Sequence, residues 1–577
     1  MILQALAEHY RTLADQGIAP AFGWSNVRVS YVLCLGKDGA LEQVISAQTQ
    51  QQKGEKRVLA PQLMKLPAPV KRSSGIAANF LCDNSAYMLG VDGKGKPRRA
   101  EACFQACKRL HEKLLEGVDS PAARGVLAFF RNWRPEQADS HPALSECWEE
   151  IVSGANLVFY YDAAFVHADP AIQQAWDTHY QNDGDGPQMV CLVTGERGAV
   201  ESIHPAIKNV PGAQSSGAAL VAFNAPAFCS YGKEQSLNAP TSKYAAFAYT
   251  TALNHLLADW EHTYRIGDTT VVCWAKSGEN TYSNIMGWMV FGRKPVYALS
   301  DMQNALKELC AGNAAQLEED RLDPDMDFYI LGISPNAARL SVRFFLRNTF
   351  SAFLQNILAH QQRLEIVKPS YEKSGPLSIE KLLDETVNQN SRDKLPAPNL
   401  AGEMLRAVLN NTRYPATLLN GITLRIRAER KITWGRAAAL KAYYLNNTNP
   451  QVPKEVLNVS LNPDSSNVPY NLGRLFSVLE AIQTAANSKL NTTIKDQYFN
   501  AASSMPNRVY PVLINLAQKH LRKLEGGLRT YYDNQLIDLM SKLEETLPDR
   551  MNLPQQGSFQ LGYYHQTQAR YEKKEEK

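Results

Sequence analysis

Residues 203–257 read IHPAIKNVPGAQSSGAALVAFNAPAFCSYGKEQSLNAPTSKYAAFAYTTALNHLL. Across the middle of this stretch, from 209 to 242, only Lys233 and Glu234 carry a charge, and small residues, amides and hydroxyls dominate. Such a segment has too few large side chains to form a core, but its backbone N–H groups can approach a flat or polyanionic surface closely. The apolar face that follows predicts a helix over 242–260, which anchors this central loop to the protein body. A loop that only connects two elements is the alternative.

Length and composition favour a soluble protein of several domains. A chain of 577 residues with 44% hydrophobic residues exceeds one core and is expected to form two to four domains. The net charge of +4 is small, so nucleic-acid binding would depend on local basic clusters. The nine cysteines show no disulfide framework, which indicates a reducing cytosol. The first fifteen residues read as an amphipathic helix rather than a signal peptide, and no apolar run of about 18 residues occurs. We therefore expect a cytoplasmic protein.

The periodicity of the sequence changes near residue 336. Before it, strand-like stretches alternate with helices such as 101–115. These stretches are 27–35, 155–167, 189–196, 271–275, 295–299 and 328–334. After it, helices are predicted over 337–365, 377–388, 400–411, 416–430 and 433–445, followed by a bundle. The predicted fold is α+β, a mixed α/β N-terminal region followed by an all-helical C-terminal region ending in a helical bundle. The predicted domains are 1–336, 337–455 and 456–577.

A second informative stretch, KLPAPVKRSSGIAANFLCDN, covers residues 65–84. Two prolines rigidify its start, and the adjacent cations Lys71 and Arg72 are followed by two serines and Gly75. Cations and hydroxyls on a loop with a glycine hinge suit contact with phosphates and with the edges of a nucleic-acid groove. A solvated basic turn is the alternative.

The helical region contains the clearest basic clusters of the chain. The first has Trp434 close by and a single acid, Glu429, among its cations. It comprises Arg425, Arg427, Arg430, Lys431 and Arg436, and a second set in the bundle comprises Lys519, Arg522 and Lys523. Basic side chains beside an aromatic ring suit a nucleic-acid backbone, through phosphate pairing and stacking. A solvated helix face explains the same pattern.

The search for catalytic motifs is largely negative. No Walker-type glycine loop and no GxSxG nucleophile elbow occurs. The metal candidates are Asp162, His167, Asp169, Asp177, His179 and His204, whose spacing is too loose to define a site. Cys103 and Cys107 lie one helical turn apart without a second pair, which favours buried thiols over half a metal site. We expect no cofactor, no metal and no catalysis, with a metal-dependent nuclease acting on DNA as the alternative.

Four strings, in order along nearly the whole chain, carry a resemblance to a known family. They are KRSSGIAANFLCDN (71–84), GAQSSGAALVAFNAPAFCSYGKEQSLNAP (212–240), FYILGISPNAARLSVRFF (328–345), and NLGRLFSVLEAIQ (471–483) with LGYYHQ (561–566). The chain resembles the large subunit of type I-C CRISPR surveillance complexes (Cascade). The resemblance implies a non-catalytic subunit that senses the protospacer-adjacent motif, helps open target double-stranded DNA and stabilises the R-loop. Implied partners are CRISPR RNA, target double-stranded DNA, the backbone, RNA-end-capping and small subunits, and a DNA-cutting helicase-nuclease recruited after R-loop formation.

The resemblance also assigns expectations to particular residues. An N-terminal loop of this family senses the motif beside the target, which points to Lys71, Arg72, Ser73, Ser74 and Asn79. The central loop is expected to touch DNA or a neighbouring subunit through Gln214, Ser215, Ser216, Asn224, Lys233, Gln235 and Asn238. Because the family makes a separate small subunit from the last part of the same gene, we expect residues from about 456 onward to form a stable helical fragment.

Overall fold

The computed structural model divides the chain into two compact units. Unit 1 comprises Met1–Pro205 and Val221–Leu253, and unit 2 comprises Ala206–Leu220 and Asn254–Lys577. The structure describes residues 1–53, 56–70, 72, 75–93, 95–182, 187–373, 375–392, 394–397, 399–487 and 490–571. Among these residues, no helix is long and apolar enough to cross a membrane.

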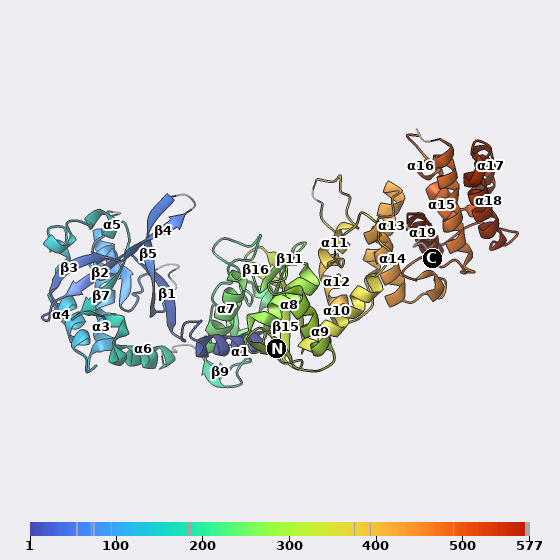
Figure 1. Ribbon diagram of the computed structural model, residues 1–577. Helices are drawn as coiled ribbons and strands as arrows, with labels where there is room; N and C mark the ends of the chain where they lie inside the picture. The colour runs from blue at the N-terminus through green and yellow to red at the C-terminus, as the bar shows by residue number, and fades with distance from the viewer. Residues whose placement is uncertain are drawn as a thin grey trace. The chain divides into compact units, whose positions relative to one another are not determined.

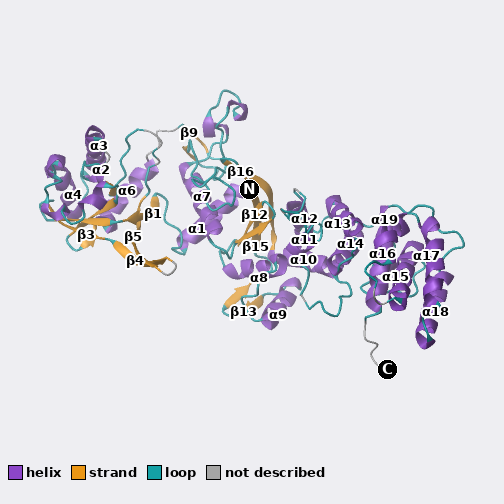
Figure 2. Cartoon of the chain, turned by 90° about the horizontal axis from the view of Figure 1, so that it is seen from above, coloured by secondary structure: helices purple, strands orange, loops and turns teal. Residues whose placement is uncertain are grey.

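Unit 1 is built on two small sheets with helices packed against them (Figures 1 and 2). Its elements are α1 (Ile2–Asp15), β1 (Trp24–Val29), β2 (Tyr31–Leu35), β3 (Leu41–Ser46), β4 (Gln48–Lys53), β5 (Lys56–Pro67), β6 (Cys82–Asn84), α2 (Ser85–Met88), α3 (Pro97–Leu115), α4 (Pro121–Asn132), α5 (Trp148–Val152), β7 (Asn156–Tyr161), β8 (Ala164–Phe165), α6 (Pro170–Asn182), β9 (Gln188–Val190) and β10 (Arg197–Ala199). One sheet has the order β1-β5-β4 and the other β3-β2-β7-β6, with β8 paired to β7; β9 and β10 form a separate hairpin. Helix α7 (Lys243–Ala258) begins in unit 1 and ends in unit 2.

The strand predicted over 27–35 is two strands in two different sheets. Strand β1 pairs with β5, whereas β2 pairs with β3 and runs parallel to β7. Ser30 lies between them, donates its N–H to Asn156 O (3.0 Å) and accepts from Ala47 N (2.8 Å). The alternation of side chains shows that a segment is extended but carries no information about which sheet it joins.

Unit 2 combines one four-stranded antiparallel sheet with the remaining helices. Its elements are β11 (Thr263–Ile266), β12 (Thr269–Ala275), α8 (Asn280–Phe291), α9 (Leu299–Cys310), β13 (Ala315–Leu317), β14 (Asp320–Leu322), β15 (Asp327–Asn336), β16 (Arg339–Thr349), α10 (Phe350–Leu364), α11 (Ile379–Asp384), α12 (Leu400–Leu409), α13 (Ala416–Glu429), α14 (Trp434–Asn446), α15 (Val468–Ala486), α16 (Ile494–Ser504), α17 (Pro506–Leu521), α18 (Gly526–Ser541) and α19 (Leu553–Ala569). The sheet order is β11-β12-β15-β16. The predicted α+β fold class is confirmed, because sheets and helices mix up to Thr349 and the described secondary structure beyond it is helical.

Two further secondary-structure predictions were wrong. The helix predicted over 337–365 is strand β16 followed by α10, and β16 pairs with β15 along its length. The burial of β16 shows no clean alternation, since Leu340 and Phe344 are buried and Val342 between them is exposed, and the long pairing with β15 overrides local helix propensity. The strand predicted over 295–299 is an irregular segment before α9, and it begins with a proline, which lacks the N–H that a sheet ladder needs.

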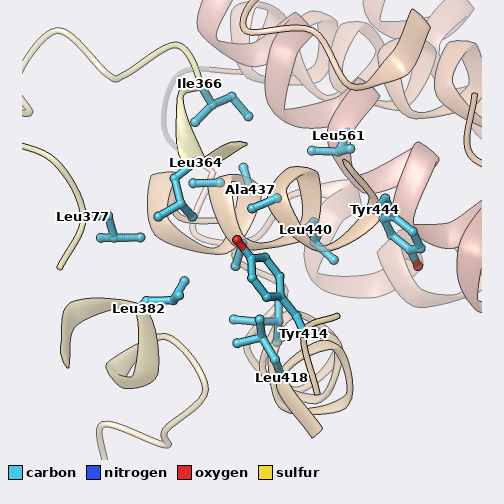
Figure 3. Close-up of a cluster of buried hydrophobic side chains, with 14 of the residues drawn as sticks. Leu364, Ile366, Leu377, Leu382, Tyr414, Leu418, Ala437, Leu440, Tyr444 and Leu561 are labelled. Carbon is cyan, nitrogen blue, oxygen red and sulfur yellow. The ribbon is translucent and has the colours of Figure 1, made fainter. Parts of the chain in front are cut away.

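One continuous core runs through unit 2. It extends from Tyr264 near the sheet to Tyr564 in α19. Figure 3 shows part of it, where Leu440 and Tyr444 of α14 lie with Leu561 of α19. The predicted domain boundaries at 336/337 and 455/456 both lie within the residues of unit 2, the first in the β15–β16 turn and the second inside the 3-10 helix Lys454–Val456.

Helices α15 and α19 cross so closely that only glycine fits at two points. A Cβ added to Gly473 of α15 would collide with the carbonyl oxygen of Phe559, and one added to Gly562 of α19 would collide with that of Tyr470. The absent side chains let the two backbones touch, and residues 556–566 of α19 are buried. This crossing holds the C-terminal bundle together.

Substitution of Gly473 by alanine is therefore expected to separate α15 from α19. We expect Gly473→Ala to lower the free energy of unfolding by about 3 kcal/mol, because the backbone atoms that it meets cannot move aside as a flexible side chain would. Gly527→Ala in α18 is the matched control, since its Cβ would meet nothing within 4 Å. Guanidinium denaturation followed by circular dichroism measures both variants, and equal stability of the two would refute the close crossing.

Candidate nucleic-acid interface

The loop that enters β6 is organised around the buried carboxylate of Asp83. Arg72 donates from Nη1 to Asp83 Oδ1 (2.9 Å) and from Nη2 to Oδ2. The backbone N–H groups of Asn79 and Asn84 donate to the same carboxylate at 2.9 and 2.8 Å. Asp83 is 2% exposed and the side chain of Arg72 24% exposed. Arg72 is thus one half of a largely buried ion pair.

Arg72 and Asn79 also close the base of the loop. Arg72 Nε donates to Ala77 O (2.6 Å), and its guanidinium lies 3.9 Å from the centre of the Tyr87 ring. Burial opposes the charge of Arg72, but the hydrogen bonds and charge of Asp83 outweigh it and leave the pKa of Arg72 raised. Asn79 Oδ1 accepts from Val70 N (2.9 Å). Both residues therefore have a structural role in the free protein.

The other three predicted motif-sensing residues, Lys71, Ser73 and Ser74, lie outside the described residues. A further cation belongs to this region that the sequence did not single out. Arg99 of α3 is exposed and donates from Nη2 to Gly75 O (3.1 Å). Arg99 is twenty-four residues beyond Gly75 in the sequence, and no local sequence pattern predicts this contact.

The central loop is shared between the two units. Residues 206–220 belong to unit 2, where Ala219 is joined to the β15–β16 turn by hydrogen bonds to Ala338 O and from Leu340 N, both 2.9 Å. Gln214, Ser215 and Ser216 are exposed on this part. Asn224, Lys233 and Gln235 are exposed on residues 221–242, which belong to unit 1.

Asn238 holds the second half of the central loop in shape. Its Oδ1 accepts from Ser230 N (2.8 Å), and its Nδ2 donates to the carbonyl oxygens of Lys233 (3.0 Å) and Gln235 (2.9 Å). All of its side-chain polar atoms are therefore occupied within the loop, so Asn238 positions its neighbours.

The feature that Asn238 supports is an exposed tyrosine at a tight turn. Lys233 N donates to Ser230 O (3.0 Å), and the two residues between them, Tyr231 and Gly232, have φ of +55° and +67°. A positive φ is uncommon at a tyrosine, and it persists only where the surrounding structure holds it. Tyr231 is 98% exposed. Tyr231 is not among the residues predicted from the sequence, although a tyrosine within a stretch of small residues could have indicated a binding role.

The basic cluster between α13 and α14 divides into buried and exposed cations. Arg436 is buried and forms ion pairs with Glu429 (2.7 Å) and Glu385 (3.3 Å), so it is not a surface contact as predicted. Arg425 is 14% exposed and lies 3.6 Å from Glu429. Arg427 donates to Gln556 Oε1 of α19 (2.7 Å). Trp434 packs against the core, with Lys368 Nζ 4.5 Å from its ring centre.

The exposed cations that remain are on two surfaces of unit 2. Arg430, in a left-handed conformation at the end of α13, and Lys431 are exposed. Lys519, Arg522 and Lys523 are exposed at the end of α17, where their spacing places them on one face. Lys523 Nζ donates to Asn487 Oδ1 (3.2 Å). These residues have the exposure that phosphate contacts require.

Three of the six candidate metal ligands make hydrogen bonds within the protein. Asp169 caps α6 and accepts from Ser120 Oγ (2.7 Å), and Asp177 accepts from Trp24 Nε1 (2.7 Å). His204 Nδ1 lies 2.7 Å from Tyr249 Oη, and burial lowers the pKa of His167 to about 4. Across the described part of the chain, no three His, Cys, Asp or Glu side chains are grouped so that they could hold a metal ion.

Comparison with known protein families supplies the decisive observation. Residues 6–571 match the family model described as CRISPR-associated protein (Cas_Csd1). The chain belongs to this family. Family membership makes it a CRISPR-associated protein of an interference complex, which associates with other Cas subunits and with CRISPR RNA. No curated protein sequence matches the chain.

The ion pair in this Cas_Csd1 protein predicts that Arg72 stabilises unit 1. Arg72→Ala leaves Asp83 buried without its cation, which is expected to lower the free energy of unfolding by about 2 kcal/mol. The double variant Arg72→Ala, Asp83→Asn removes the unpaired charge and is expected to recover at least half of this loss. Chemical denaturation followed by tryptophan fluorescence compares the variants. A double variant no more stable than Arg72→Ala would contradict the ion pair.

Proposed function

We propose that this chain is the large subunit of a type I-C interference complex. In this role it senses the short motif that flanks the target, helps open double-stranded DNA and stabilises the R-loop by binding, without catalysis. The guide RNA reads the target sequence by base pairing, while the protein reads a short motif, duplex shape and backbone. Its partners are CRISPR RNA, target double-stranded DNA, the other Cascade subunits and a DNA-cutting helicase-nuclease.

The observation that carries this proposal is the fixed base of the loop at residues 70–84. Asn79 joins Val70, and Arg72 joins Asp83, at two points that bracket the sequence positions of Lys71, Ser73 and Ser74. A basic loop with a fixed base loses less conformational entropy when it binds a duplex than a free chain would. Phosphate and base-edge contacts both benefit from such preorganisation.

Tyr231 supports the part of the proposal that concerns opened DNA. An aromatic ring that is 98% exposed offers a stacking surface to an unpaired base. The neighbouring Lys233 is exposed and adds a charge suited to the adjoining phosphate. The exposed cations at the ends of α13 and α17 offer further phosphate contacts on unit 2.

Lys71 is the residue whose loss tests motif sensing without breaking the Arg72–Asp83 pair. In the assembled complex, Lys71→Ala is expected to weaken binding to duplex targets about tenfold, which corresponds to one lost groove contact. Binding to a single-stranded target should stay within about twofold of wild type, because guide pairing then needs no opening of a duplex. Lys37→Ala, an exposed lysine in the turn between β2 and β3, is the matched control.

Electrophoretic mobility shifts with labelled duplex and single-stranded targets measure both affinities at fixed salt. Equal duplex binding by Lys71→Ala and wild type would remove Lys71 from the interface. Cleavage of the duplex by the purified chain with Mg²⁺ or Mn²⁺, abolished by Asp162→Ala, would overturn the non-catalytic assignment.

The aromatic ring of Tyr231 is expected to matter more than its hydroxyl. Tyr231→Ala should weaken R-loop formation on duplex targets about tenfold, whereas Tyr231→Phe should retain wild-type behaviour, because stacking uses the ring face. Tyr371→Ala removes a tyrosine that is 82% exposed elsewhere and serves as the control. Permanganate footprinting of unpaired thymines reports the opened DNA. Full opening by Tyr231→Ala would show that the ring is not used.

A further inference from the structure

A hollow of about 530 Å³ lies among helices α15, α18 and α19 of the C-terminal bundle. Four tyrosines line it: Tyr531 and Tyr532 of α18, Tyr563 of α19, and Tyr571 just beyond α19. Its size falls in the range typical of small-ligand pockets. None of these residues belongs to the basic surfaces described above.

Short side chains on α15 leave room for the hollow. Ala481, Thr484 and Ala485 occupy the α15 side, at positions where a larger residue would fill the space. On the opposite side, Tyr563, Thr567 and Arg570 follow one another at helical spacing along one face of α19. The hollow therefore results from short side chains on α15 facing larger ones on α18 and α19.

Arg570 contributes a cation with unused hydrogen-bonding capacity. Its Nη2 donates to Ser477 Oγ (2.9 Å), and Ser477 in turn lies 2.8 Å from Thr567 Oγ1, which fixes the guanidinium in place. Arg570 Nε is buried and has no hydrogen-bond partner. Among the described residues, no carboxylate forms an ion pair with Arg570. A guanidinium that pairs with no carboxylate of the protein can pair with an anionic ligand instead.

Glu480 carries the one negative charge among the residues that line the hollow, and the nearby Lys495 offsets part of it. Glu480 accepts from Tyr563 Oη (2.6 Å) and from Thr493 Oγ1 (2.9 Å), so both of its oxygens are occupied by the protein. Burial raises the pKa of Tyr532, and raises that of Tyr563 well above its usual value. Both phenols therefore remain neutral at physiological pH.

We propose that this hollow binds a nucleotide of single-stranded DNA. The N–H groups of the Arg570 guanidinium donate hydrogen bonds to the phosphate. The exposed rings of Tyr531 and Tyr571 stack on the base. An arginine beside several aromatic rings is the combination that nonspecific single-strand sites use. The proposal deepens the R-loop role and rests on it, because an opened duplex supplies the unpaired strand.

The test measures binding of the full chain to a fluorescently labelled twelve-nucleotide thymidine strand by anisotropy at fixed salt. Arg570→Gln and Tyr571→Ala are each expected to weaken binding about tenfold. Tyr571→Phe keeps the ring and should match wild type. Arg529→Gln is the matched control, because Arg529 is exposed on α18, outside the hollow, and is paired with Asp533. Its loss should change affinity less than about twofold.

An abasic strand separates stacking from charge. The wild-type protein should bind the abasic strand about as weakly as the Tyr571→Ala variant binds the thymidine strand. On the abasic strand, Tyr571→Ala should bind as tightly as wild type. Arg570→Gln should still weaken binding of the abasic strand. Equal effects of Tyr571→Ala on both strands, or none on either, would overturn the proposal. Tighter binding of a uridine RNA strand than of the DNA strand would overturn the choice of DNA as the ligand.

Failure of this site is distinguishable from failure of the proposed function. If the assembled complex opens duplex targets normally with Arg570→Gln and the anisotropy is unchanged, only the tyrosine hollow is refuted. If the wild-type complex neither binds nor opens duplex targets, the R-loop role is refuted, whatever the isolated chain does with single strands.

Discussion

A buried polar group must find its partner inside the protein, and this constraint decides which residues are left for binding. Asp83 is buried with four donors directed at its carboxylate, two of them from Arg72. Arg436 is buried between Glu385 and Glu429 in the same way. Arg72 and Arg436, which the sequence pattern predicts as nucleic-acid contacts, therefore form ion pairs inside the protein. What remains exposed is a smaller set, which includes Arg430, Lys431 and the cations at the end of α17.

Four helices of the second half, α11 to α14, were predicted with ends within four residues, because their apolar faces repeat with a clear period. The predicted helix over 416–430 corresponds to α13, and that over 433–445 to α14, with Thr433 as the capping residue. Strands were harder, since β16 is specified by its long pairing with β15 rather than by local preference. The sheet to which a strand belongs depends on contacts far along the chain, which explains why β1 and β2 were merged.

The candidate site was predictable as a set of segments, but not residue by residue. Composition located the basic and glycine-rich loops, because those properties are local. Whether Arg72 points to solvent or to Asp83 depends on the burial of β6, and no local pattern encodes it. Tyr231 was missed for the opposite reason, since its importance comes from a backbone conformation rather than from its residue type. The tyrosine hollow likewise unites residues from 480 to 571 that no sequence motif connects.

The central loop has a consequence for how the protein is made. Because residues 206–220 belong to unit 2 and residues 221–253 to unit 1, the chain passes between the units three times. During synthesis, at about 5–20 residues per second, unit 1 cannot be completed until Leu253 has left the ribosome. A single peptide cleavage at one passage would leave the units joined by the other two. The stretch with the fewest large side chains is therefore also the one that makes the two units covalently hard to separate.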